Sequence, residues 1–221
     1  MNASGSKLAG YRILNHTDSV HRFLQTLPQR RVKRDALRAL RGSILRSELY
    51  ALDGSQRTER PYTVTEYAYG LREESAPPAD DPTRLHIFFA HPLAQRTTQW
   101  ERGNDPMTQF AFTDDYDAFG QAQRQTHIAC PRGWRSLNDK PTEPYLATRT
   151  RTVYAAPIDA THYIHNRVAK TTSFEIVNTS SRRIDELVAL DDTSTDLKLI
   201  GQTLSYYDGP AFVGLPFGQI G

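Results

Sequence analysis

Three carboxylates fall within four residues of one stretch, at Asp114, Asp115 and Asp117. Carboxylate oxygens grouped this closely can bind Ca²⁺. The stretch lacks the loop pattern of an EF-hand, and Asp is also a common turn residue whose carboxylate bonds back to the backbone. We therefore interpret the three acids as turn residues at the solvated tip of a hairpin, and we predict no bound metal.

Two further groups of side chains could bind a metal or act as a nucleophile. His162 and His165 have the spacing of a metal-binding pair, but no cysteine or second pair accompanies them, so surface histidines are the better interpretation. Cys130 and His127 could form a nucleophile and its base. Residues three apart on a strand point to opposite faces, so we interpret Cys130 as a small buried hydrophobic residue.

The sequence contains neither a Gly-x-Ser-x-Gly nucleophile elbow nor a phosphate loop of the Walker type. No pair of acid and base residues stands out either. We therefore expect no cofactor, and an enzyme is the weakest hypothesis for this chain.

Arginines and aromatic residues supply two possible binding surfaces. Arg149 and Arg151, with Arg132 and Arg135 nearby in the sequence, could bind phosphate or an acidic partner; a solvated strand face is the simpler interpretation. Exposed aromatic side chains could stack on sugars, as in a carbohydrate- or cell-surface-binding module, although cross-strand packing explains them more simply. These side chains are Tyr67, Tyr69, Trp100 and Tyr116.

Composition favours a β protein. The 221 residues could form one large β domain or two small ones, and 11 Tyr and 9 Phe against 2 Met suit sheets better than helices. The net charge of +2 gives no reason to expect nucleic acid. A single cysteine excludes an intrachain disulfide. No apolar run is long enough to span a membrane and no Sec signal peptide is seen, so we expect a soluble protein that does not insert into membranes directly.

The elements that position these side chains are mostly strands. Met107–Phe112 and Gln121–Ile128 both alternate with period two, so they predict a β-hairpin. Gly120 can supply the positive φ that the turn needs, and Asp117 can bond to the turn backbone. A second Tyr-Asp-Gly occurs at Tyr207, Asp208 and Gly209, again after alternating residues.

The rest of the chain predicts further hairpins after an irregular lead-in at residues 1–31. A short helix is expected at 34–41, capped by Gly42, and Asp53-Gly54 predicts a tight hairpin turn. Residues 183–190 fit either a short helix or a strand. Charged or Pro-rich loops are expected at 73–82 and 131–144, and strands at 43–52, 61–70, 85–89, 94–102, 146–155, 171–178 and 197–207.

Several longer blocks of residues carry a resemblance to a known family. These are Leu37–Gly42, Leu45–Gly54, Arg60–Tyr67, Gln95–Gly103, Asp105–Gln109, the Tyr116-Asp117 hairpin and Tyr206–Phe212. From about Ala36 onward the chain resembles the B component of bacterial insecticidal toxin complexes (Tc toxins), in the stretch that leads into its first RHS/YD repeats. Residues 1–31 carry no such resemblance.

The resemblance implies an all-β fold of mainly antiparallel hairpins, a segment of an RHS/YD-repeat shell spanning 32–221, with one or two short helices. Its structural YD turns would be Tyr116, Asp117, Gly120, Tyr207, Asp208 and Gly209. The implied function is structural and non-catalytic: the shell encloses the toxic C-terminal part of a partner chain. The implied partners are the C component and, through a full-length B chain, the channel-forming A component of a secreted toxin.

The sequence also departs from that family's pattern. A complete B component is far larger and carries a β-propeller, and the family's autoprotease aspartates have no counterpart here. The apolar stretch Ala211–Gly221 favours a chain that continues into a larger structure. The alternative hypothesis is the carbohydrate- or cell-surface-binding module.

Overall fold

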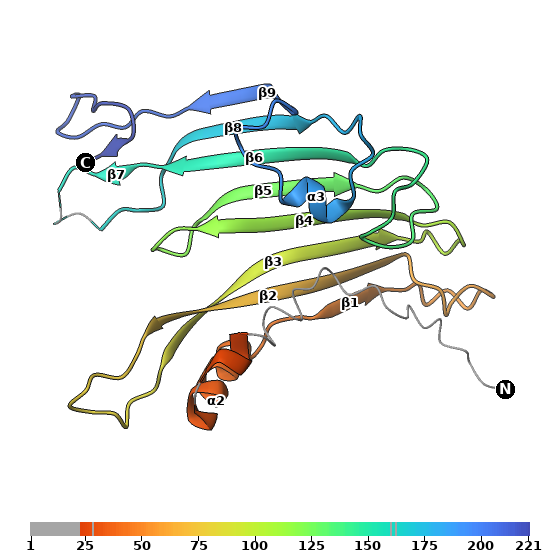
Figure 1. Ribbon diagram of the computed structural model, residues 1–221, viewed down its shortest axis with the longest axis horizontal. Coiled ribbons are helices and arrows are strands. Elements are labelled where there is room, and N and C mark those ends of the chain that lie inside the picture. The colour runs from red at the N-terminus through yellow and green to blue at the C-terminus, as the bar shows by residue number, and fades with distance from the viewer. Residues whose placement is uncertain (1–22, 28, 160, 162) are drawn as a thin grey trace. The chain divides into compact units, whose positions relative to one another are not determined.

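The computed structural model describes residues 23–27, 29–159, 161 and 163–221, and these form two compact units (Figure 1). The first unit holds the chain up to Thr108 together with Arg132–Asp139, and the second holds Gln109–Pro131 and Lys140–Gly221. Antiparallel strands with a few short helices make up both units, so the all-β prediction is confirmed. Most of the irregular lead-in, residues 1–22, lies outside the described residues.

The first unit contains an antiparallel sheet of three strands, β1 (Arg46–Leu49), β2 (Thr63–Ser75) and β3 (Ile87–Gln99). The segments 85–89 and 94–102, predicted as two strands, belong to one long strand. Pro92 interrupts the alternation within it, and the register shifts where Pro92 pairs with Tyr69. A bulge is where a strand tolerates proline, so the apparent break in the sequence pattern is a local irregularity.

The prediction of a tight turn at Asp53-Gly54 is wrong. Leu49 of β1 pairs with Thr63 of β2, so the connection is a loop over residues 50–62. The Asp53 carboxylate accepts a hydrogen bond from the backbone N–H of Ser55 at 3.1 Å and forms an ion pair with Arg102 at 2.7 Å. Long-range pairing with Arg102 therefore shapes this loop in place of a two-residue hairpin.

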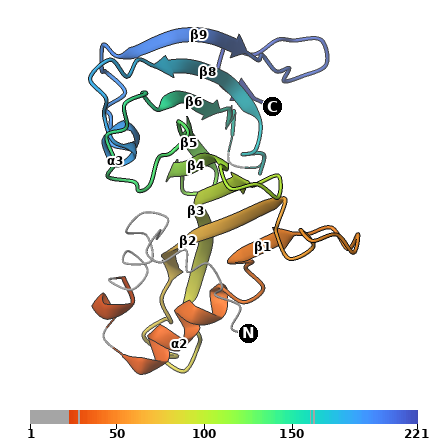
Figure 2. The same cartoon turned by 90° about the vertical axis from the view of Figure 1, so that its right-hand side faces the viewer.

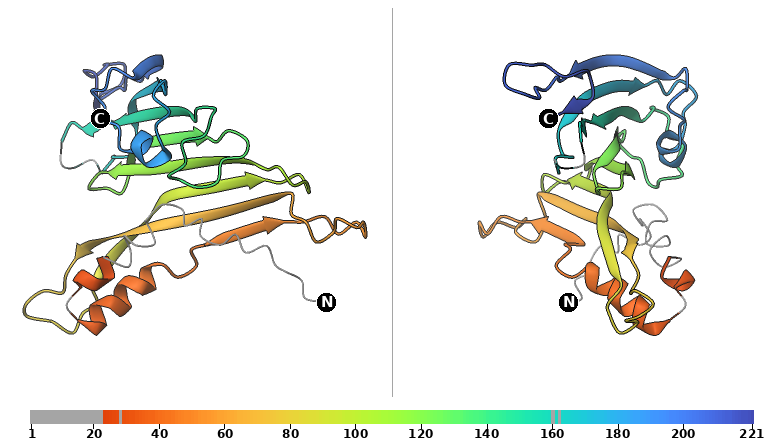
Figure 3. Two further views of the ribbon diagram at one scale, coloured as in Figure 1. Left: turned by 45° about the vertical axis from the view of Figure 1, so that its right-hand side comes forward. Right: turned by 90° about the vertical axis from the view of Figure 1, so that its left-hand side faces the viewer.

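Helix α2 (Arg30–Ala39) packs on this sheet, beside the long β2–β3 hairpin (Figure 3). It begins four residues earlier than the predicted 34–41, although its N-cap residue Gln29 makes no side-chain cap bond. Burial explains the earlier start: Val32 and Ala36 join Leu27 and Leu71 in one apolar cluster. The buried face of the helix, not a capping signal, sets where it begins.

The second unit contains a meander of five antiparallel strands. Neighbouring strands pair in the order β4, β5, β6, β8 and β9. Their bounds are β4 (Met107–Tyr116, whose first two residues belong to the first unit), β5 (Ala122–Ala129), β6 (Leu146–Tyr154), β8 (Val168–Ile176) and β9 (Leu197–Leu204). The predicted hairpin between Met107 and Ile128 is present as β4 and β5.

One face of this meander is the core side. Phe110, Ile128, Ala147 and Ile176 lie opposite one another across four strands, and all four are buried. Helix α3 (Ile184–Val188) resolves the ambiguity at 183–190 in favour of a helix, and its Ile184 and Leu187 are fully buried. Figure 2 shows α3 beside the sheet of this unit.

Two minor strands, β7 (Ala156–Pro157) and β10 (Gln219–Ile220), pair in parallel, and Ile220 packs there with Ala155 and Ala169. In the described part of the chain, no helix combines the length and the apolar character that crossing a bilayer requires.

Candidate functional site

The exposed face of the five-stranded meander is the broadest candidate surface. His127, Thr148, Glu175 and Lys198 form one row across β5, β6, β8 and β9, and all four are exposed. The alternation of each strand places them opposite the buried apolar row. This row is polar, whereas two apolar side chains near it, Leu146 and Ile200, are 70% and 59% exposed.

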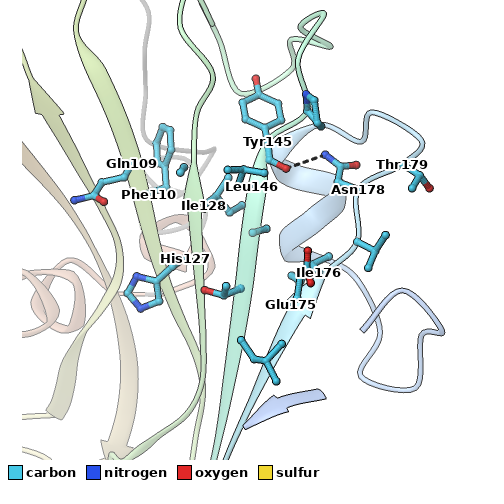
Figure 4. A pocket seen from close by; sticks show the side chains of 16 residues that line it. Gln109, Phe110, His127, Ile128, Tyr145, Leu146, Glu175, Ile176, Asn178 and Thr179 are labelled. Atoms are coloured by element: carbon cyan, nitrogen blue, oxygen red, sulfur yellow. Dashed lines mark hydrogen bonds between the residues drawn. The ribbon is translucent and has the colours of Figure 1, made fainter. Parts of the chain in front are cut away.

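A depression of about 630 Å³ lies over this part of the sheet (Figure 4). Residues of β4, β5, β6 and β8 line it, together with Ile200 of β9, Tyr145 and the segment after β8. Asn178 Nδ2 donates to the Tyr145 backbone oxygen at 3.4 Å. His127 and Glu175 are the lining residues that could act as a base and an acid, but β6 lies between their strands. Two strand spacings amount to about 10 Å, so these two side chains are not placed as an acid–base pair.

Beneath the buried face, Arg149 joins β6 to α3. Its side chain is fully buried. Its guanidinium donates to the backbone oxygens of Leu187 at 3.0 Å, Val188 at 3.1 Å and Leu190 at 2.6 Å. It thereby satisfies carbonyls at the C-terminal end of α3, where the helix dipole also favours a cation.

Side-chain acceptors complete the environment of Arg149. Its Nη1 lies 3.0 Å from an Asp192 carboxylate oxygen and its Nε donates to Thr126 Oγ1 at 3.2 Å. Burial lowers the pKa of Arg149 below its ordinary value, and the hydrogen bond that Arg149 donates to Asp192 opposes that shift. A buried guanidinium with partners on all its nitrogens is a structural group, so the expectation of a solvated strand face is wrong for Arg149.

The hairpin turn between β4 and β5 is held by its own residues. Asp117 Oδ1 accepts hydrogen bonds from the backbone N–H groups of Phe119 at 2.8 Å and Gln121 at 2.9 Å. Gly120 has φ of +77°, a value that L-residues rarely adopt. Partial burial raises the pKa of the neighbouring Tyr116 to about 12, with a further contribution from the negative charge of Asp114.

The second Tyr-Asp-Gly forms a smaller turn. Asp208 and Gly214 form an isolated antiparallel β-bridge, and the Gly209 N–H donates to the Val213 backbone oxygen at 3.0 Å. The Tyr207 hydroxyl donates to the Val168 backbone oxygen at 2.8 Å, which ties this turn to β8. Both Tyr-Asp stretches therefore turn the chain, while their role as repeat units of a shell stays a prediction.

Comparison with known proteins bears directly on this architecture. The family described as "Insecticide toxin TcdB middle/C-terminal region" matches residues 35–184, more than half of the chain. The chain belongs to this family. The resemblance to a Tc toxin B component is thereby confirmed. No curated protein matches the chain.

Solved structures share the fold of this TcdB-family chain. A crystal structure of TcdB2–TccC3 superposes with a TM-score of 0.66 at 23% identity and covers 86% of this chain. The Photorhabdus luminescens Tc holotoxin pore gives a TM-score of 0.65 at 22% identity and covers 83%. In both cases the chain spans only 10% of the matched chain.

The three acids of the TcdB-family hairpin form ion pairs and turn contacts, and Arg124 contacts both Asp114 and Asp115. Asp114 pairs with Arg124 at 2.5 Å and Asp115 with Arg151 at 2.5 Å, whereas Asp117 serves the turn. The hydrogen bond from Arg151 lowers the pKa of Asp115 below its ordinary value. Among the described residues no group of His, Cys, Asp and Glu is arranged to hold a metal ion.

The other candidate residues are dispersed. His127 is exposed, and Cys130 is partly exposed where we expected burial. His162 lies outside the described residues, while His165 stacks on Phe119 with ring centroids 3.7 Å apart. In the first unit Arg132 pairs with Asp105 at 2.8 Å, and Arg135 lines a pocket of about 190 Å³ with Trp100 and Trp134.

Tyr67 and Tyr69 of β2 lie opposite Gln95 and Pro92 of β3, so their cross-strand partners are not aromatic. The Tyr69 hydroxyl donates to the Ile44 backbone oxygen at 3.1 Å.

Sequence reasoning missed Asp192 and the carbonyls of α3 as partners of Arg149. The strand alternation could have indicated its burial, because Arg149 lies two residues from Ala147 and therefore on the same face of β6.

Proposed function

We propose that this chain forms part of the wall of a Tc-type toxin shell that encloses the toxic C-terminal part of a partner chain. The observation that carries the proposal is the two-faced meander of the second unit. Its apolar row and Arg149 are buried, while the row from His127 to Lys198 is exposed. A wall needs such a sheet: one face builds the protein core and the other faces the enclosed space.

The mechanism follows from the chemistry of the exposed face. An unfolded cargo chain gains free energy by burying apolar surface. The row of His127, Thr148, Glu175 and Lys198 offers little apolar surface on which that chain could collapse. The proposed role is therefore non-catalytic, and the separation of His127 from Glu175 supports it.

The proposed partners are those of a B component. The matched structures are described as TcdB2–TccC3 complexes and as a Tc holotoxin pore. By this analogy, the wall segment would contact the C component, which supplies the cargo and the rest of the shell. It would meet a channel-forming A component only through a full-length B chain, in a secreted or extracellular toxin.

Site-specific photo-cross-linking tests the proposal. A full-length B component that carries this segment is assembled with its C component, with a photoreactive residue in place of Thr148 on the exposed face. The matched control places it at Asp185 of α3, whose side chain is 41% exposed on the covered side of the sheet. We expect cross-links to the C-terminal part of the C component from position 148 and none from position 185.

The opposite pattern, or the absence of cross-links from position 148 in an assembled complex, contradicts the proposal. A glycan-array signal that Trp100→Ala abolishes would instead favour the carbohydrate-binding alternative.

A further inference from the structure

Helix α2 presents a strongly basic face that the shell proposal does not use. Six cationic side chains and one leucine line a depression of about 780 Å³. These residues, called here the basic face, are Arg30, Arg31, Lys33, Arg34, Leu37, Arg38 and Arg41. Positions 30, 34 and 38 recur every four residues, so they share one side of the helix, and Arg41 lies in the turn after its end. Val32 and Ala36 on the other side are buried in the core of the first unit.

The basic face has little compensating charge. Asp35 is the one acidic residue of α2, and its side chain is only 2% exposed. Its carboxylate serves inward contacts, with the Arg38 guanidinium at 3.3 Å and the His86 backbone N–H at 3.4 Å. Arg31 is engaged by backbone oxygens of the loop before β3, including that of Arg84 at 3.1 Å.

For the remaining cations, no such partners are found among the described residues. Within the described ranges, no carboxylate forms an ion pair with Arg30, Lys33, Arg34 or Arg41. Like charges four residues apart on a helix repel, which applies to Arg30 and Arg34 and again to Arg34 and Arg38. The first turn holds no acidic residue. The arrangement therefore costs free energy that a bound polyanion would relieve.

We propose that the basic face of α2 docks an acidic peptide segment of a partner protein. Five of the six cations are arginines, whose planar fork binds carboxylate and phosphate oxygens alike. Leu37 lies among them and is 52% exposed, which fits an apolar side chain of a peptide. A single leucine gives too little apolar surface to anchor a helix in a membrane, and a phosphate backbone would leave it without a contact.

The dimensions set the length of the segment. The nine steps from Arg30 to Ala39 rise about 14 Å along the helix, and Arg41 lies two residues beyond its end. An extended chain advances about 3.3 Å per residue, so about five residues of the partner cover the basic face. The expected segment is therefore short, mostly Glu or Asp, with one apolar residue near its centre.

Fluorescence anisotropy on the full chain tests this inference. The probe is a labelled short peptide of glutamates with one central leucine, measured in physiological salt. We expect Arg34→Glu with Arg41→Glu to weaken its binding by about tenfold or more, because two attractions become repulsions. The matched control reverses two other exposed arginines, Arg57→Glu with Arg167→Glu, which changes the net charge equally and should leave the affinity within about twofold.

A second variant isolates the apolar contact. Leu37→Ser should weaken the leucine-containing peptide about threefold while leaving an all-glutamate peptide unchanged. Far-UV circular dichroism confirms that each variant keeps its fold. The proposal is overturned if the control pair weakens binding as much as the α2 pair. Tighter binding of duplex DNA or phosphatidylserine vesicles than of the peptide also overturns it, since those ligands would assign the face to another partner.

Discussion

At the scale of single residues, Arg149 shows how a charged side chain can belong to a core. Its guanidinium donates hydrogen bonds to three backbone oxygens, a threonine hydroxyl and the Asp192 carboxylate. Burying a charge costs free energy unless such partners are present. Arg149 therefore connects β6 to the segment that contains α3 through these hydrogen bonds.

Replacing Arg149 by methionine should lower the free energy of unfolding by about 3 kcal/mol or more, because it leaves the buried carbonyls of Leu187, Val188 and Leu190 without their donor. Arg151→Met is the matched control on the same strand. Its side chain is 31% exposed and its ion pairs are with partly exposed acids, so a loss of about 1 kcal/mol or less is expected. Urea unfolding followed by circular dichroism measures both, and equal losses would show that burial of Arg149 is not what matters.

At the scale of elements, the β4–β5 hairpin depends on a turn whose geometry two residues enforce. Asp117 anchors two backbone N–H groups and Gly120 adopts a left-handed conformation. The same turn brings Phe119 onto His165, so it also holds the loop before β8.

Gly120→Val should lower the melting temperature, because a β-branched residue at positive φ costs about 1–3 kcal/mol. Asp117→Ala should cost about 1 kcal/mol or more through the loss of its two acceptor bonds. Gln123→Ala, on β5 of the same hairpin, is the control and should change stability by less than about 0.5 kcal/mol. A thermal melt in which Gly120→Val behaves like Gln123→Ala would contradict the role of the turn.

At the scale of the whole molecule, each unit ends in a strand whose outer edge has no described partner strand. In the second unit that strand is β9, where Leu199 and Ile200 are 61% and 59% exposed. In the first unit it is β1, all four residues of which are exposed. Such edges can pair with other strands, as a wall segment requires.

The chain on its own should therefore associate with increasing concentration, as measured by light scattering after size exclusion. Ile200→Lys should reduce that association, because a charge on an edge strand opposes further pairing. Lys198→Arg, which keeps the charge on the same strand, is the control. A monomer with a sharp cooperative melt at all concentrations would instead mark a self-standing domain and favour the binding-module alternative.

The sequence alone was sufficient for the features that depend on local pattern. Period-two alternation on both sides of Asp117 and Gly120 predicted the hairpin, and its turn chemistry followed from the residue types. The blocks beginning at Leu37 identified the family, because a series of motifs in order is specific where one Tyr-Asp is not. The strand content followed from the same alternation.

Only the tertiary structure decided which side chains are buried and which segments bury or pair with them. Alternation shows that Arg149 and Arg151 share a phase, but α3, more than thirty residues later, buries Arg149 and leaves Arg151 partly exposed. Asp53-Gly54 carries a turn signal that the distant Arg102 overrides, and burial of Val32 extends α2 to Arg30. The physical reason is common to all three. Local sequence determines the directions of side chains, whereas burial and ion pairing depend on segments that meet only in the folded chain.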